Sequence, residues 1–239
     1  AWRAAAMWRT SWLSREVIAL PLFMAGVTAW GLAHAGGAGP TLALGLASAL
    51  LCVALFVCTG MIYATIRFMQ EWAHPLTLVN FTLLGCASGF TLATALAAAL
   101  QPALAVVLAP WALGLTLAGA ASRWAALARN ARLVPRSTLQ TAIGVRHPRI
   151  RQLAMGFTGG SFNTREFFHG RAPQALRAVK WAFLLLAFVL PALALALAPA
   201  TPGWLGLAFG MQFLGLLAER WFFFAQANHP QNLYYKTIS

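Results

Sequence analysis

Residues 8–17 read W-R-T-S-W-L-S-R-E-V, and an apolar run follows them directly to about residue 33. Arginines, tryptophans and hydroxyls ahead of roughly 20 apolar residues are typical of a helix that enters a bilayer from its interface. The same stretch contains Glu16, one of four acidic residues in the chain. This boundary therefore bears on both the fold and the function.

The overall composition is that of an integral membrane protein. Of the 239 residues, 60% are hydrophobic and 9% are charged, whereas about a quarter of the residues in soluble domains are charged. Apolar runs long enough to cross roughly 30 Å of hydrocarbon predict an all-α, polytopic transmembrane helix bundle that forms a single domain, residues 1–239. The six predicted helices span residues 15–33, 41–68, 76–100, 103–124, 179–198 and 204–224.

The charges fall on one side of this predicted bundle. Following the six helices back and forth across the bilayer places all 17 basic and all four acidic residues on the side where the first helix begins. By the positive-inside rule this side is the cytoplasm. The net charge of +13 is thereby explained by topology, and we expect no nucleic-acid partner.

Residues 122–178 form the one long polar segment between predicted helices. Apolar residues and glycines alternate there with charges, which favours an ordered cytoplasmic surface that contacts partner subunits. The alternative is a basic loop that faces lipid and only sets the topology. The segment holds ten arginines, which are Arg123, Arg129, Arg132, Arg136, Arg146, Arg149, Arg151, Arg165, Arg171 and Arg177.

The sequence lacks the patterns of the common redox cofactors. A haem between membrane helices needs two facing imidazoles, but all five histidines lie in predicted loops or at helix ends. Metal-binding and phosphate-binding motifs are missing as well, so we expect no haem and no metal in this chain. The helix middles consist of Ala, Leu, Val, Phe and Gly, which argues against a transporter because transporters place polar groups near the midplane.

Glu16 is the candidate catalytic residue. Ser14 is placed as the N-cap of the first helix, which puts Glu16 in the first turn, where the helix dipole stabilises an anion. A purely structural interpretation pairs Glu16 with Arg9 or Arg15. A functional interpretation has Glu16 exchange hydrogen bonds or protons with a quinone, whose ring needs polar partners at the headgroup level and whose tail needs lipid.

Other polar side chains near this boundary are candidates for the same pocket. Tyr63 and Arg67 are one helical turn apart, and Thr77 lies near the start of the third helix. Plain hydrogen bonding between helices is the alternative role for each. The Glu219-Arg220 pair either forms ion pairs across the bundle or serves as a second polar wall of the pocket, and we expect the structural role. The predicted quinone-binding residues beside Glu16 are Arg9, Trp12, Ser14, Arg15, Tyr63, Arg67 and Asn80.

Several stretches resemble a known family. Residues 1–17, A-W-R-A-A-A-M-W-R-T-S-W-L-S-R-E-V, resemble the loop before the third helix of the membrane anchor subunits of dimethyl sulfoxide reductase-type molybdoenzymes. The resemblance is strongest to the branch that serves cytoplasmic sulfite dehydrogenases. It extends over residues 61–89, residues 155–170 and residues 217–235, the last of which read L-A-E-R-W-F-F-F-A-Q-A-N-H-P-Q-N-L-Y-Y.

The resemblance implies an eight-helix anchor without haem. Such an anchor binds an iron–sulfur electron-transfer subunit, which contacts a molybdopterin catalytic subunit. It also implies a quinone site in which the acidic residue matching Glu16 acts together with a histidine on the preceding helical hairpin. Either two helices precede residue 1, or this protein departs from the family pattern.

Topology and resemblance together predict the function. We expect a multi-pass subunit of the bacterial inner membrane, with its basic loops and its partners on the cytoplasmic side. It would pass electrons from a sulfite dehydrogenase to ubiquinone or menaquinone without moving net charge across the bilayer. The alternatives are an anchor whose complex oxidises quinol, and a structural anchor without a quinone site.

Overall fold

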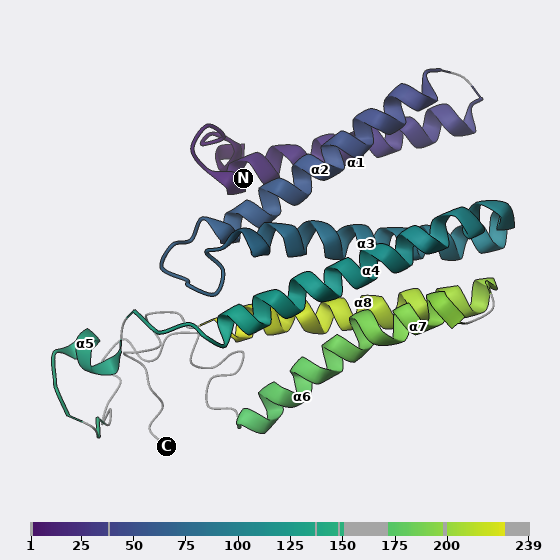
Figure 1. The fold of residues 1–239 in the computed structure, drawn as a ribbon. Coiled ribbons are helices and arrows are strands. Elements are labelled where there is room, and N and C mark those ends of the chain that lie inside the picture. The colour runs from purple at the N-terminus through teal and green to yellow at the C-terminus, as the bar shows by residue number, and fades with distance from the viewer. Residues whose placement is uncertain are drawn as a thin grey trace.

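The computed structural model describes residues 2–37, 39–136, 138–147, 149–150, 172–197 and 200–227. Within these ranges every regular element is a helix, which confirms the predicted all-α class. Figure 1 shows the long helices running side by side in one bundle. Consecutive helices run in opposite directions, as expected for a chain that crosses a membrane repeatedly.

Six long helical stretches build the bundle within the described ranges. They are α1 (Trp12–Ala35), α2 (Thr41–Ala64), α3 (Pro75–Leu100), α4 (Pro102–Asn130), α8 (Pro202–Ala225) and the stretch made of α6 (Pro173–Leu184), a π-helical turn (Leu185–Val189) and α7 (Leu190–Leu197). A short 3-10 helix (Trp2–Ala5) and α5 (Leu139–Ile143) lie outside them. Five of the six long stretches, all except α8, are long and apolar enough to cross a membrane. Helix α8, which carries Gln212, Glu219 and Arg220, nonetheless packs along α3, α6 and α7.

Helix α1 begins at Trp12, three residues earlier than predicted. Its N-cap is Ser11, whose hydroxyl accepts a hydrogen bond from the backbone N–H of Ser14 at 3.4 Å. An N-cap bonds the third residue of its helix, so Ser14 is that third residue and the prediction of Ser14 as the cap was wrong. Glu16 consequently lies in the second turn, beyond the strongest effect of the helix dipole.

Helix α2 ends at Ala64, four residues earlier than predicted. The Thr65 hydroxyl donates to the carbonyl oxygen of Met61 at 2.8 Å, and tight turns follow at Ile66 and Met69. Arg67 is therefore exposed in the connection to α3 rather than one helical turn from Tyr63. The predicted continuation of the helix to residue 68 was wrong because the chain turns to reach α3.

Helices α4 and α6 both extend into the predicted polar segment. Helix α4 continues to Asn130, and α6 begins at Pro173, so the connection between them is shorter than residues 122–178. Residues 151–171, including Arg151, Arg165 and Arg171, lie outside the described residues. The role of this segment in contacting partners remains a prediction.

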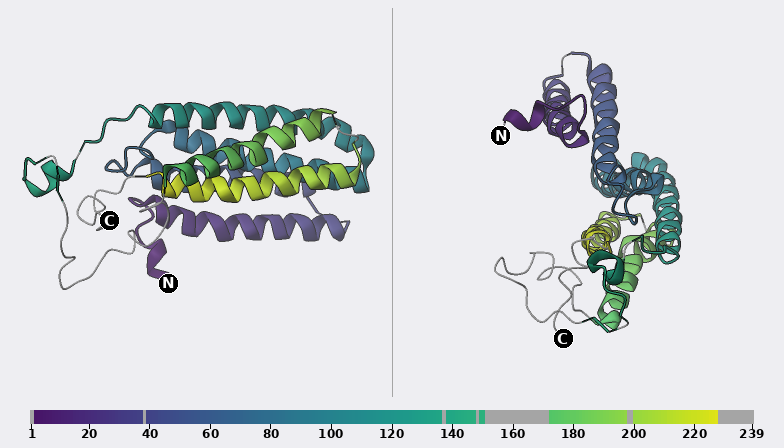
Figure 2. Two further views of the ribbon diagram at one scale, coloured as in Figure 1. Left: turned by 90° about the horizontal axis from the view of Figure 1, so that it is seen from below. Right: turned by 90° about the vertical axis from the view of Figure 1, so that its left-hand side faces the viewer.

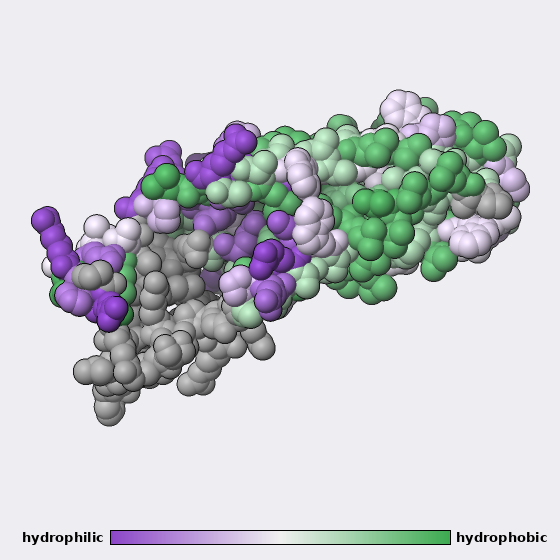
Figure 3. All heavy atoms as spheres, turned by 60° about the horizontal axis from the view of Figure 1, so that its bottom comes forward, coloured by the Kyte–Doolittle hydropathy of each residue, from purple (hydrophilic) through white to green (hydrophobic). Residues whose placement is uncertain are grey.

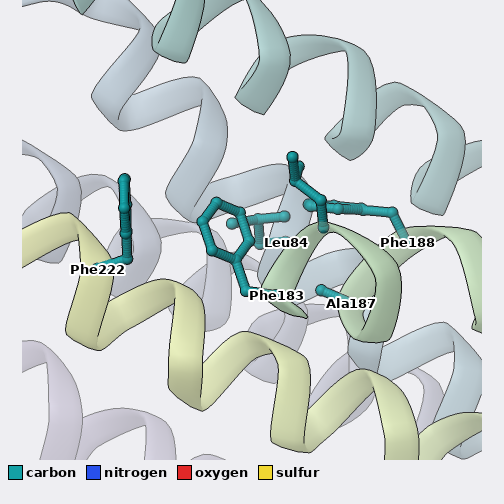
Figure 4. Close-up of a cluster of buried hydrophobic side chains, with 6 residues drawn as sticks. Leu84, Phe183, Ala187, Phe188 and Phe222 are labelled. Atoms are coloured by element: carbon teal, nitrogen blue, oxygen red, sulfur yellow. The ribbon is translucent and has the colours of Figure 1, made fainter. Parts of the chain in front are cut away.

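The main core lies where α3, α6, the π-helical turn and α8 meet. Leu84 of α3 packs there against Phe183, Ala187 and Phe188, with Phe222 of α8 beside them (Figure 4). A second buried cluster, mostly of alanines, lies where α3, α4 and α8 meet near the other end of the bundle, and it comprises Ala95, Ala97, Ala98, Ala105 and Leu205. Helix α1 stands at the edge and is joined to the rest through α2 (Figure 2).

A polar contact lies in the middle of the bundle. Gln212 is buried on α8, and its side-chain amide donates to the Thr116 hydroxyl of α4 at 3.1 Å and to the Ala187 carbonyl oxygen at 3.4 Å. The prediction that the helix middles hold only apolar residues and glycine was therefore wrong. Gln212 and Thr116 carry no charge, so their hydrogen bonding to each other reduces the cost of burying both.

Charged side chains of the described ranges gather at one end of the bundle. Figure 3 shows hydrophilic residues over this end and a hydrophobic surface over the remaining length. The N-terminal segment, the α2–α3 connection and the end of α4 all lie there, together with the start of α6 and the end of α8 (Figure 1). This end is called the charged end below.

Candidate functional site

Glu16 is held at the charged end by a neutral partner. Its carboxylate accepts a hydrogen bond of 2.5 Å from the Thr59 hydroxyl of α2, and its side chain is half-buried between α1 and α2. Neither Arg9 nor Arg15 forms an ion pair with Glu16, because the ion pairs of the described residues join other groups. The structural interpretation of Glu16 as an arginine partner was therefore wrong in its contacts.

Arg15 instead fastens the segment that precedes α1. Its guanidinium donates to the carbonyl oxygens of Trp8 and Arg9, each at 2.8 Å, and lies 4.2 Å from the ring centroid of Trp12. The exposed Arg9 lies over the Trp8 ring, 5.3 Å from its centroid. The fold thus brings together three predicted site residues, Arg9, Trp12 and Arg15, in one local structure next to Glu16. Their contacts hold the backbone that precedes α1.

Tyr63 is the centre of an aromatic cluster that sequence reasoning did not find. Its ring stacks on Phe81 of α3 at 5.5 Å and makes edge contacts with Trp72, Phe223 and Phe224 at 5.4–5.5 Å. The indole of Trp72 also donates to the carbonyl oxygen of Phe223 at 3.1 Å. These five residues, called the Tyr63 cluster below, join α2, the α2–α3 connection, α3 and α8.

A buried ion triad lies next to this cluster. Glu219 of α8 is fully buried; one carboxylate oxygen lies 2.7 Å from Nε of Arg123 on α4, and the other lies 2.6 Å from Nε of Arg220. The expected ion pairing across the bundle is confirmed for Glu219, which meets Arg123 of α4, whereas Arg220 pairs with its neighbour Glu219 on α8. Arg123 was counted with the polar segment, where that segment overlaps the end of the predicted helix 103–124. In the structure α4 continues to Asn130, and Arg123 is buried against α8 with 2% of its side chain exposed.

Tyr63 lies next to neighbours of both the ion triad and Glu16. The Arg220 guanidinium lies over Phe81 and Phe223, 4.1 and 5.0 Å from their ring centroids. Tyr63 stacks on the same Phe81 ring, and on α2 it lies one helical turn from Thr59, the hydrogen-bond partner of Glu16. A carboxylate from α1, a phenol from α2 and a guanidinium from α8 are therefore connected through shared neighbours at the charged end.

The remaining predicted site residues divide into two groups. Asn80 is buried on the inner face of α3, and its side-chain oxygen has no hydrogen-bond partner among the described residues. Ser14 is also buried, and Thr77 donates to the Trp72 carbonyl oxygen at 2.7 Å. Arg67, by contrast, is exposed in the α2–α3 connection, so the fold does not bring it into this arrangement.

His74 closes the start of α3 at the same end. Its Nδ1 accepts a hydrogen bond from the backbone N–H of Leu76 at 3.1 Å, which serves as an N-cap. Partial burial, and then the nearby charge of Arg129, lower the pKa of His74. A neutral ring is what this bond requires, since a protonated Nδ1 has no free electron pair to accept it.

An apolar cavity of about 210 Å³ lies between α1 and α2, away from Glu16. It lies between residues 23–30 of α1 and residues 45–52 of α2 and has very little polar surface. It therefore suits a hydrocarbon chain better than a quinone head. The cavity is lined by Phe23, Val27, Trp30, Gly45, Ser48, Ala49 and Cys52.

Comparison with known proteins confirms the family resemblance that the sequence showed. Residues 1–199 match the family described as DMSO reductase anchor subunit (DmsC). The chain is also 53% identical over 254 aligned residues to a sulfite dehydrogenase subunit of Allochromatium vinosum, an alignment that covers all of this chain and 78% of that relative. No solved structure matches the chain significantly.

Proposed function

The chain belongs to the DMSO reductase anchor subunit family, and from this premise we propose that it exchanges electrons between an iron–sulfur partner subunit and quinone at its charged end. As a multi-pass membrane anchor it would hold that iron–sulfur subunit and, through it, a molybdopterin catalytic subunit. The similarity to a sulfite dehydrogenase subunit makes sulfite the substrate that we propose for the catalytic subunit.

The observation that carries this proposal is the environment of Glu16. A carboxylate clamped by arginine keeps its charge, whereas Glu16 is bonded to the Thr59 hydroxyl, which can serve a charged or a protonated carboxyl group by donating or accepting. Glu16 also lies at the charged end, where a quinone head at headgroup depth is within reach of water. These properties suit a group that passes protons to a bound quinone.

The proposed reaction is balanced at one membrane face. Oxidation of sulfite with water to sulfate releases two electrons and two protons at the molybdenum subunit. The electrons pass through the iron–sulfur partner to the quinone, and two protons from the same aqueous side, delivered through Glu16, complete the quinol. Turnover then moves no net charge across the bilayer, and reconstituted proteoliposomes should develop no membrane potential.

We also propose that the charged end faces the cytoplasm of a bacterial inner membrane. The positive-inside rule supports this orientation, because the basic residues of the described ranges lie at that end. Cysteines introduced at Gly37, in the connection between α1 and α2, and at Arg136, which follows the end of α4, test this in a background without native cysteines, because the two connections are at opposite ends of the bundle. A membrane-impermeant thiol reagent added to intact spheroplasts should label the residue-37 variant alone; labelling of the residue-136 variant would reverse the orientation.

Replacement of Glu16 by glutamine tests the quinone role directly. In the assembled complex, Glu16→Gln should lower the rate of sulfite-dependent reduction of a soluble quinone analogue by about 10²-fold, the lower range for loss of a general acid or base. Reduction of a water-soluble dye by the catalytic subunit should persist. Glu71→Gln, at the same end of the bundle, is the matched control. Equal loss of both activities in Glu16→Gln would instead indicate a structural anchor.

A further inference from the structure

The ion triad of Arg123, Glu219 and Arg220 has a net positive charge. Glu219 supplies one negative charge against the two arginines, and each of its oxygens contacts an Nε atom. One further nitrogen of each guanidinium, Nη2 of Arg123 and Nη1 of Arg220, is buried without a hydrogen-bond partner among the described residues. A buried, unpaired donor on a charged group costs free energy unless a ligand satisfies it.

Arg220 is the member of the triad that a ligand can reach. Its side chain is 28% exposed, whereas Glu219 is 0% and Arg123 2% exposed. The guanidinium is fixed on one side by Glu219 and on its face by Phe81 and Phe223. An arginine held in this way loses little conformational entropy when its remaining N–H groups donate to a ligand.

The position of Arg220 relative to Glu16 indicates the ligand. A para-quinone carries its two oxygens at opposite ends of an aromatic ring, so its head requires polar groups on two sides and apolar faces between them. On α2, Tyr63 lies one helical turn from Thr59, the partner of Glu16. The Tyr63 ring stacks on Phe81, the ring that the Arg220 guanidinium also covers, so aromatic faces are present close to both charged groups. Glu16 alone accounts for one end of such a head.

We propose that Arg220 is a second quinone-binding residue, whose guanidinium donates a hydrogen bond to the ring oxygen farther from Glu16. Glu219 and Arg123 act as positioning residues that hold this guanidinium in place. The guanidinium would also favour reduction, because a charge-assisted hydrogen bond stabilises the negative charge that the quinone oxygen gains as electrons arrive. This inference rests on the proposed quinone function and adds the residue that binds the second oxygen.

The test uses the intact complex with sulfite as electron donor and decylubiquinone as acceptor. Arg220→Gln should raise the KM for decylubiquinone at least about tenfold, equivalent to about 1.4 kcal/mol, while dye reduction per assembled complex stays normal. Arg220→Lys, which keeps the charge but not the planar donor geometry, should give a smaller increase. Arg132→Gln, an exposed arginine at the same end, should leave the KM unchanged.

The outcomes separate this inference from the proposed function. An unchanged KM in Arg220→Gln together with impaired quinone reduction in Glu16→Gln would overturn the role of Arg220 alone. Full quinone-coupled activity in both variants would overturn the quinone function itself. If Arg220→Gln does not assemble, Arg220→Lys decides: an assembled complex with a normal KM contradicts the inference, and a raised KM supports it.

Discussion

Thr59 and Glu16, one on each helix of the α1–α2 hairpin, are joined by a hydrogen bond of 2.5 Å from the threonine hydroxyl to the carboxylate. Glu219, at the same end of the bundle, is instead clamped between two arginines. A hydroxyl can donate to its partner or accept from it, whereas two guanidinium groups can only donate and hold the Glu219 carboxylate from both sides. The different surroundings of the two glutamates agree with the roles that we propose, which are proton exchange for Glu16 and positioning for Glu219.

Replacing Thr59 with valine should weaken the quinone reaction without unfolding the hairpin. Valine preserves the shape of threonine but removes the hydroxyl, so Glu16 loses the hydrogen bond that orients its carboxylate. Loss of about 1 kcal/mol of stabilisation corresponds to a rate lowered roughly fivefold. Thr59→Ser should retain most of the activity. The initial rate of quinone reduction, normalised to dye reduction, measures the effect. Thr28, whose hydroxyl bonds the Met24 carbonyl oxygen on exposed α1, supplies the control Thr28→Val, and an equal loss there would contradict the assignment.

Glu219→Gln should destabilise the bundle strongly. The change leaves Arg123 buried without its counter-ion, and breaking a buried ion pair in this way costs about 3–5 kcal/mol. The double variant Arg123→Met with Glu219→Met should recover much of that stability, because it removes both members of the cross-helix pair. Thermal unfolding of the detergent-solubilised complex measures both effects. A double variant no more stable than Glu219→Gln would show that the pair is not coupled as the distances indicate.

Gly215→Ala should be destabilising although alanine favours helices. Helix α8 crosses the π-helical turn so closely that an added Cβ at Gly215 would overlap the backbone of Ala187, and backbone atoms cannot rotate away. Gly206 and Gly210, on the same helix, have open space at the corresponding position, so alanine there should be neutral or stabilise by about 0.5–1 kcal/mol. Unfolding temperatures of the three variants give the comparison, and a uniform response would exclude close packing as the reason for Gly215.

Stability should fall as the pH drops below about 6.5, the ordinary pKa of histidine, because of His74. Its pKa is lowered in the folded protein, so the unfolded chain binds the proton more readily and acid favours unfolding. The stabilising contribution is complete above the unfolded-state pKa and is lost as the pH falls toward the folded-state pKa. His74→Asn keeps an N-cap without a titrating ring, and it should flatten this part of the profile of unfolding temperature against pH between 5 and 8.

Local properties of the sequence were sufficient for the class of the fold. Apolar runs and turn residues predicted the all-α bundle and its six helical stretches, because the length of hydrocarbon to be crossed acts on each segment separately. The one-sided charge pattern followed for the same reason, and Tyr63, Asn80 and Glu16 were found as polar residues near that side. The ends of α1 and α2 were misplaced by three or four residues, since capping depends on which hydroxyl meets which backbone group.

What the sequence determined by itself is that this protein is a membrane bundle with its charges at one end, since every residue meets the cost of lipid burial individually. The tertiary structure alone decided which of those charges meet. Each residue along a helix turns the side chain by about 100°, so the rotation of α4 and α8 against each other determines that Arg123 faces Glu219. In the same way, the packing of α1 on α2 gives Glu16 a threonine as its partner instead of an arginine.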